Sequence, residues 1–379
     1  MSAISSLSSF LQNITLVQNS QNQIANLTYQ VDTGLKYQDL SGYGTQANQL
    51  LNLQSGQTTE QNYVSNNTQT GTFLTAYDST MSQINSDATS LSASLDAFTV
   101  TDPDAVSNLK ALVSGLQTDV AATLNTQVGD RYLYGGTRYT TAPVGDLTAL
   151  PAPTFVTPAT TPPTVTPLTV TDGTIPSPQT TPPTYLVPPY DTDAATLNAS
   201  AAPAAATIAA AGQTYAQQTT AVANNQTTTY GISSNNPTFQ HLIYALQNAQ
   251  AAASTDTSTP AGVANQAALI KQATSELAIA MNGAPAVAAS AGPPAVAAVA
   301  AVASLQSLQD QNGTAEVIVA NANTVHTQTL ATLQSQITSI DQVDPATVAT
   351  ELSTAQNTLE GSYKVVASVL SETLLNYLK

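Results

Sequence analysis

The chain of 379 residues contains no Cys and no Trp, and it has only two His. The absence of Cys excludes disulfide bonds, thiolate catalysis and zinc sites built from thiolates. A catalytic triad or a two-histidine metal site would need His241 and His326 together with carboxylates, yet the two lie far apart in the sequence. No H-E-x-x-H, G-x-S-x-G or P-loop motif occurs. We therefore expect a protein that is not an enzyme and has no catalytic, cofactor-binding or metal-binding residue; a His beside two carboxylates in a cleft would indicate otherwise.

Charge is scarce, and most of it is negative. Charged residues make up 8% of the chain, with 7 Lys and Arg against 23 Asp and Glu, so the net charge is −16. Such a chain is repelled by phosphate and lacks the basic patch that holds a protein on anionic lipid. We expect no nucleic-acid partner and no membrane partner.

Two segments bear on targeting and on membrane insertion. The N-terminus has no basic region and no small-residue cleavage site after an apolar run, so we expect no cleaved signal peptide. Residues 277–309 carry no charge, but they contain three prolines and many alanines. Alanine contributes little to membrane insertion, so a soluble helix is the favoured interpretation.

The N-terminal residues 1–37 have helical spacing. Apolar residues step by three or four, and the helix is expected to end at Gly34, which can take the left-handed conformation of a C-terminal cap. The residues of this narrow seam are Ile4, Leu7, Leu11, Ile14, Val17, Ile24, Leu27 and Val31. A glycine-rich turn at 41–44 follows, and residues 45–54 predict another short helix.

The strongest periodic signal runs from Tyr63 to Phe98. Its positions step four, three, four, three for five heptads, which predicts a helix about 50 Å long that needs other long helices beside it. They are Tyr63, Asn67, Thr70, Leu74, Tyr77, Met81, Ile84, Ala88, Leu91, Leu95 and Phe98. Asp102-Pro103 then predicts an N-cap with proline at the first helical position.

The middle of the chain differs from both ends in composition and in residue pattern. Residues 129–143 contain aromatic residues at alternating positions, bounded by glycines, and this pattern predicts a strand or hairpin. From Pro143 to Pro203 lie 14 of the 21 prolines, so helix is excluded over most of this stretch, leaving an extended insertion or an irregular β module. Residues 204–232 predict strands, and helices are predicted from Asn236-Pro237, over 261–281 and over about 294–340.

The C-terminal segment repeats the N-cap device at Asp344-Pro345 and continues as a heptad seam to the end of the chain. The predicted fold class is mainly α: long terminal coiled-coil helices form a bundle around a central, irregular, β-like insertion rich in Pro and Thr. We expect three parts: 1–128 and 236–379 form the helical core, and 129–235 form the variable insertion.

Several short motifs occur in an order typical of one family. Residues 130–137 read DRYLYGGT with a proline at 143, residues 229–233 read TYGIS, and residues 236–239 read NPTF. Residues 340–352 read IDQVDPATVATEL, and 374–378 read LLNYL. With terminal helices around a variable centre, the chain resembles the bacterial flagellin superfamily, and most of all its hook–filament junction proteins, the third hook-associated proteins. Residues of about 1–140 and 310–379 carry the resemblance; the turn at 41–44 departs from the acidic turn of most members.

The resemblance implies a structural, self-assembling subunit of the bacterial flagellum that supports motility. It implies export through the flagellar type III apparatus with an export chaperone, and an extracellular location. Partners would be further copies, other hook-associated proteins and flagellin. Terminal helices in this superfamily are largely disordered in the monomer and pair on assembly. The candidate assembly interface is Ile4, Leu7, Leu11, Ile14, Ile24, Leu27, Leu359, Val366, Leu370, Leu374, Leu375 and Leu378.

Two alternative functions remain open from the sequence. One is a filament-forming flagellin, which would lie along the whole filament rather than at its base. The other is a secreted coiled-coil adhesin or type III translocator, which would bind a membrane or host surface and use its central segment to do so.

Overall fold

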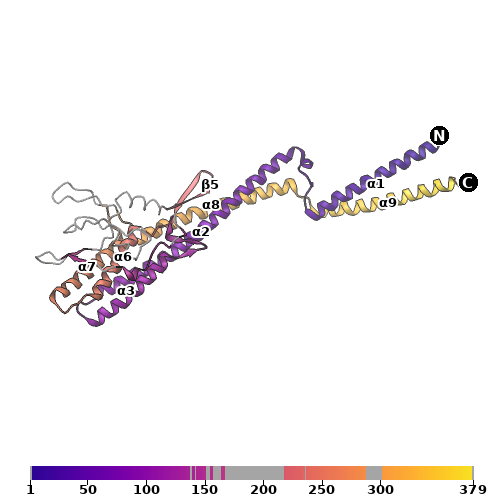
Figure 1. Ribbon diagram of the computed structural model, residues 1–379. Helices are drawn as coiled ribbons and strands as arrows, with labels where there is room; N and C mark the ends of the chain where they lie inside the picture. The colour runs from indigo at the N-terminus through magenta and orange to yellow at the C-terminus, as the bar shows by residue number, and fades with distance from the viewer. Residues whose placement is uncertain are drawn as a thin grey trace. The chain divides into compact units, whose positions relative to one another are not determined.

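The computed structural model describes residues 2–136, 139–140, 142–150, 154–156, 164–166, 217–234, 236–286 and 301–377 (Figure 1). The chain divides into two compact units, one of residues 1–64 with 324–379 and one of residues 65–323. The described residues are mainly helical, as the sequence predicted. Their α-helices are α1 (Ser2–Thr33), α2 (Ala47–Asp96), α3 (Pro103–Leu124), α6 (Pro237–Ser254), α7 (Pro260–Asn282), α8 (Leu305–Asp341) and α9 (Pro345–Tyr377).

The core of the 65–323 unit lies along the predicted heptad seam of α2. Leu74, Ile84, Ala88 and Leu91 are fully buried there and pack in one hydrophobic cluster with residues of α3, α6, α7 and α8. The sequence prediction of a short helix at 45–54 separate from the seam was wrong: α2 is continuous from Ala47 to Asp96. Phe98, the last predicted seam position, lies just beyond its end.

Three helices of this unit begin at side-chain caps. The side-chain oxygens of Asp102, Asn236 and Thr259 accept hydrogen bonds from backbone N–H groups in the first turns of α3, α6 and α7, and each helix has proline at its start. This satisfies N–H groups that have no partner inside a helix. The helix starts predicted at 102–103 and 236–237 are therefore confirmed.

Short antiparallel strand pairs complete the unit. They are β1 (Gln127–Val128) with β2 (Arg131–Tyr132), β3 (Thr154–Val156) with β4 (Thr164–Thr166), and β5 (Gln218–Ala223) with β6 (Gln226–Tyr230). The hairpin predicted at 129–143 is reduced to two-residue strands followed by the 3-10 helix η2 (Leu133–Gly135). Most of the Pro/Thr-rich segment lies outside the described residues.

Tyr134 of the DRYLYGGT motif and Phe239 of the NPTF motif meet in the core. Their ring centroids are 5.5 Å apart in an edge-to-face arrangement, and Tyr134 also packs edge-to-face on Tyr77 of α2 at 5.2 Å. The Tyr77 hydroxyl donates to the backbone carbonyl of Leu133. Burial raises the pKa of both tyrosines, so both stay neutral. These contacts therefore hold η2, which directly follows β2, on α2 and α6.

The start of α8 differs from the prediction. The pattern predicted a helix from about residue 294, but α8 begins at Leu305, and Val302 forms an antiparallel bridge with Ala284. Residues 294–300 lie outside the described residues. Within the part of the chain that the structure describes, no helix is long and apolar enough to cross a membrane.

In the other unit, Gly34 ends α1 with a positive φ of 73°, as predicted, and Pro345 begins α9 after the cap Asp344. The 3-10 helix η1 (Leu40–Gln46) leads into α2. Tyr43 of η1 and Leu50 of α2 form a small hydrophobic cluster with Ile337 and Ile340 of α8. The predicted division into 1–128, 129–235 and 236–379 stays a prediction.

Candidate assembly interface

The terminal helices α1 and α9 pack side by side in one chain (Figure 1). Leu27 of α1 is buried against Val348 and Ala355 of α9, with Ile24 and Leu352 partly buried beside them. Farther along the pair, Gln21 Nε2 donates to the Tyr363 hydroxyl at 2.7 Å. The α1 residue of this second contact lies earlier in the chain than Leu27, whereas its α9 residue lies later than Ala355. The two helices are therefore antiparallel. Each terminal helix thus already has a partner within its own chain.

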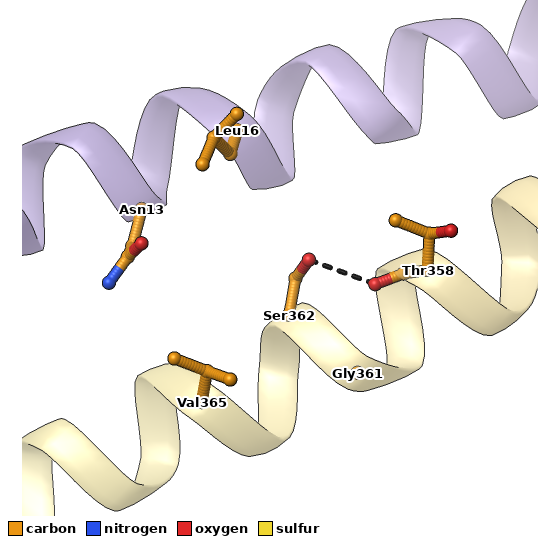
Figure 2. Close-up of a pocket in the computed structure, with 6 residues that line it drawn as sticks. All are labelled: Asn13, Leu16, Thr358, Gly361, Ser362 and Val365. Atoms are coloured by element: carbon orange, nitrogen blue, oxygen red, sulfur yellow. Dashed lines mark hydrogen bonds between the residues drawn. The ribbon is translucent and has the colours of Figure 1, made fainter.

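A shallow groove opens between the two helices beyond these contacts. Its volume is about 270 Å³, and it is lined by Asn13, Leu16, Thr358, Gly361, Ser362 and Val365. Figure 2 shows Asn13 and Val365 pointing into the space between the helices, while the Ser362 hydroxyl donates to the backbone carbonyl of Thr358 at 2.9 Å. Contact between α1 and α9 is therefore incomplete along this part of the pair.

The same part of the pair exposes large hydrophobic side chains. Leu11 and Leu16 of α1 are 56% and 57% exposed, and Tyr363 and Val365 of α9 are 48% and 53% exposed. Single exposed hydrophobic residues are common on protein surfaces, whereas several of them gathered on one pair of helices offer apolar surface to a partner. Leu11 and Leu16 are five residues apart and Tyr363 and Val365 are two apart, so on each helix they point to different sides, and we call these four the exposed α1–α9 residues.

The predicted interface residues are distributed unevenly. Leu27 is buried, Leu11 is exposed, and Ile14, Ile24, Leu359 and Val366 are intermediate. Ile4, Leu7, Leu370, Leu374 and Leu375 lie in α1 or α9, but their side chains are outside the described part, as is the whole of Leu378. The prediction missed Leu16, Tyr363 and Val365. A strict heptad seam omits all three. The wider face of a straight helix with a period of 3.6 residues would have included Tyr363 and Val365, which stand on either side of the α9 seam, but not Leu16, which lies on the opposite side of α1 from Leu7 and Ile14.

The two connectors at the base of the pair are joined to one another. Leu35, in the α1–α2 connector, bridges Gln342, in the α8–α9 connector. The backbone N–H of Lys36 donates to the Asp341 carbonyl at 2.7 Å. The Tyr43 hydroxyl donates to the Asp341 carboxylate, whose pKa burial raises. These contacts hold together the two points at which the chain passes from α1 towards α2 and from α8 into α9.

Each histidine meets one glutamate rather than two carboxylates. His241 Nδ1 lies 2.5 Å from Glu276 Oε2 in the α6–α7 hairpin, and both side chains are buried. His326 Nδ1 contacts Glu60 Oε2, and its ring stacks on Tyr63 at a centroid distance of 4.9 Å. No group of three or more His, Cys, Asp and Glu side chains that could hold a metal occurs in the described part of the chain. The expectation that the protein is not an enzyme stays a prediction.

No protein-family model matches the chain, and no curated protein is similar to it.

Proposed function

We propose that the protein is a structural subunit of the bacterial flagellum that assembles through its terminal helices at the hook–filament junction. The order of the motifs at 130–137, 229–239 and 340–352 supports this function. The observation that carries it is the set of exposed α1–α9 residues. Two helices that pair with each other and still expose four large hydrophobic side chains suit further helices from neighbouring copies.

The partners follow from this assignment. The subunit would contact further copies of itself, the hook-associated proteins on either side and flagellin. Its lack of Cys and its weakly apolar terminal helices suit export by the flagellar type III apparatus with a chaperone, followed by folding outside the cell.

Val365→Asp tests the proposed interface. A carboxylate buried between copies would cost several kcal/mol at each contact unless it became protonated. We expect the monomer to unfold at an unchanged temperature, because Val365 is half-exposed there, while cells secrete the variant but do not retain filaments and do not swim. Val325→Asp is the matched control, since Val325 is 58% exposed on α8, outside the α1–α9 pair. Normal swimming of the Val365→Asp strain would contradict the interface.

Immunogold labelling of intact cells tests the location. Label at the filament base supports the junction assignment, and label along the filament length identifies a filament-forming flagellin instead. Label on the cell envelope, or on host membranes, identifies a secreted adhesin or translocator.

A further inference from the structure

The packing of α2 against α8 contains a stretch without a buried hydrophobic side chain. The stretch comprises residues 54–64 of α2 and 324–336 of α8, all of which belong to the unit formed by residues 1–64 and 324–379. On one side of it, Leu50 and Ile337 are buried. Within it, the only buried side chain is that of His326, which is 6% exposed. Because apolar burial is interrupted here, we call these two segments the apolar gap.

The gap does not arise from a change in helix periodicity. His326 occupies the same heptad position of α8 as Val319, Leu333 and Ile340. On α2, Glu60 is in register with Leu53, one heptad before it, and with Asn67 and Leu74, one and two heptads after it. An ionisable pair therefore stands at heptad positions that are otherwise apolar on α8 and mostly apolar on α2.

The side-chain hydrogen bond, ion pair and ring stack across the gap join polar or aromatic residues. His326 meets the Glu60 carboxylate and stacks on Tyr63, with 16° between the ring planes. On α2, one turn from Glu60, Gln57 Nε2 donates to Gln334 Oε1 at 2.5 Å. A Cβ placed on Gly56 would come to 3.6 Å from a side-chain methyl group of Leu333, so the partly exposed Leu333 also reaches across the gap. Glu60, Tyr63 and His326 form what we call the latch.

Burial of apolar surface is the main force that holds two helices together, and in the gap no hydrophobic side chain is fully buried. A hydrogen bond to a charged group and one ring stack replace it. We propose that the apolar gap is a built-in opening point of the α2–α8 pair, and that the latch holds it closed. The gap opens locally while the core around Leu74, Ile84 and Leu91 stays intact, as is typical of segments with few buried apolar contacts.

Hydrogen exchange of the full chain, followed by mass spectrometry, tests this device. In the unaltered protein, residues 54–64 and 324–336 should exchange faster than residues 74–95. In His326→Ala the gap should exchange about ten- to a hundredfold faster, the range for loss of a hydrogen bond to a charged group, and residues 74–95 should not change. Glu60→Gln keeps the shape of the side chain and removes its charge, so it should give a smaller acceleration in the same two segments.

The double variant Glu60→Leu/His326→Leu separates a latch from a general loss of structure. Two leucines would continue both heptad patterns, so the gap should exchange more slowly than in the unaltered protein. Lys364→Ala is the control, because it breaks the exposed pair with Glu360 on α9, and it should leave exchange in the gap unchanged. Equal protection of the gap and of residues 74–95 in the unaltered protein would overturn the proposal. So would equal acceleration of both regions in Glu60→Gln, or faster exchange in the leucine variant.

Discussion

At the scale of single residues, Asp87 is a buried acid in the α2 seam region. Its side chain is 6% exposed, Gln83 donates to one carboxylate oxygen, and the other oxygen is buried without a hydrogen-bond partner among the described residues. Burial raises the pKa of Asp87, and the neighbouring carboxylate of Asp119 raises it further. The charged form is therefore disfavoured in the folded protein.

Asp87→Asn should stabilise the protein at neutral pH. Because the folded-state pKa lies above the unfolded-state pKa, the penalty is fully present above the folded value and disappears below the unfolded value. The thermal midpoint, followed by circular dichroism, should rise by about 2 °C at pH 7 for a unit of this size, and the gain should vanish near pH 3. Asp119→Asn should act in the same direction and more weakly. A lower midpoint at pH 7 for Asp87→Asn would show that the carboxylate is satisfied.

His241 and Glu276 form a buried polar pair between α6 and α7. Removal of one partner leaves the other buried without its counterpart, which typically destabilises a protein by about 3 kcal/mol. We expect this loss for His241→Ala, measured by denaturant unfolding with an unchanged dependence on denaturant concentration. Lys364→Ala, in an exposed pair, should change stability by less than about 0.5 kcal/mol. A comparably small loss in His241→Ala would mean that the pair contributes little.

At the scale of elements, α1 and α9 differ from α2 in how much they bury. Among the described side chains, only Leu27 of α1 and Val348 and Ala355 of α9 are buried. The α2 seam buries Leu74, Ile84 and many others. Weak burial does not offset the conformational entropy of ordering two long helices.

We expect near-zero protection from hydrogen exchange in the monomer over residues 1–35 and 350–379, with stable amides over 63–125. Because α1 and α9 pack on each other around Leu27 and Val348, the amides near these two residues should be the best protected part of the two helices. Exchange measured by mass spectrometry on a verified monomer checks this. Strong protection along the whole of both helices would show that the pair is stable without neighbouring copies.

At the scale of the whole molecule, the central segment is attached at two neighbouring points. Gln218 Nε2 donates to the Gly136 carbonyl at 3.2 Å, and Gln218 Oε1 accepts from Arg131 Nη2 at 2.6 Å. The Arg131 guanidinium lies between the rings of Phe73 and Tyr139. Residues on either side of the segment are thus held together by the 65–323 unit itself.

Removal of residues 151–189, bridged by a short Gly/Ser linker, should therefore leave that unit folded. The deleted stretch has one charged residue, Asp172, and no heptad pattern. Because the attachment points lie close together, a shorter connection adds no strain. The thermal midpoint, secretion and swimming should stay close to those of the unaltered protein. A large fall in the midpoint would show that β4, which lies beside α7, belongs to the core.

Local signals in the sequence determined the helix termini and the α2 seam. Asp102-Pro103, Asp344-Pro345 and Gly34 act within one turn of the chain, because a cap satisfies its own helix. Such signals need no knowledge of the rest of the fold.

Only the tertiary structure decided which helices meet. The pairing of α1 with α9, and of Glu60 with His326, joins residues more than 250 positions apart, and no local pattern encodes it. The polar stretch 54–62 concealed the continuity of α2, because a helix without an apolar face has no periodicity to detect. The exposed α1–α9 residues were only partly predictable for a related reason. A periodic pattern shows which residues share one side of a helix, but the position of the partner helix decides which of them remain exposed.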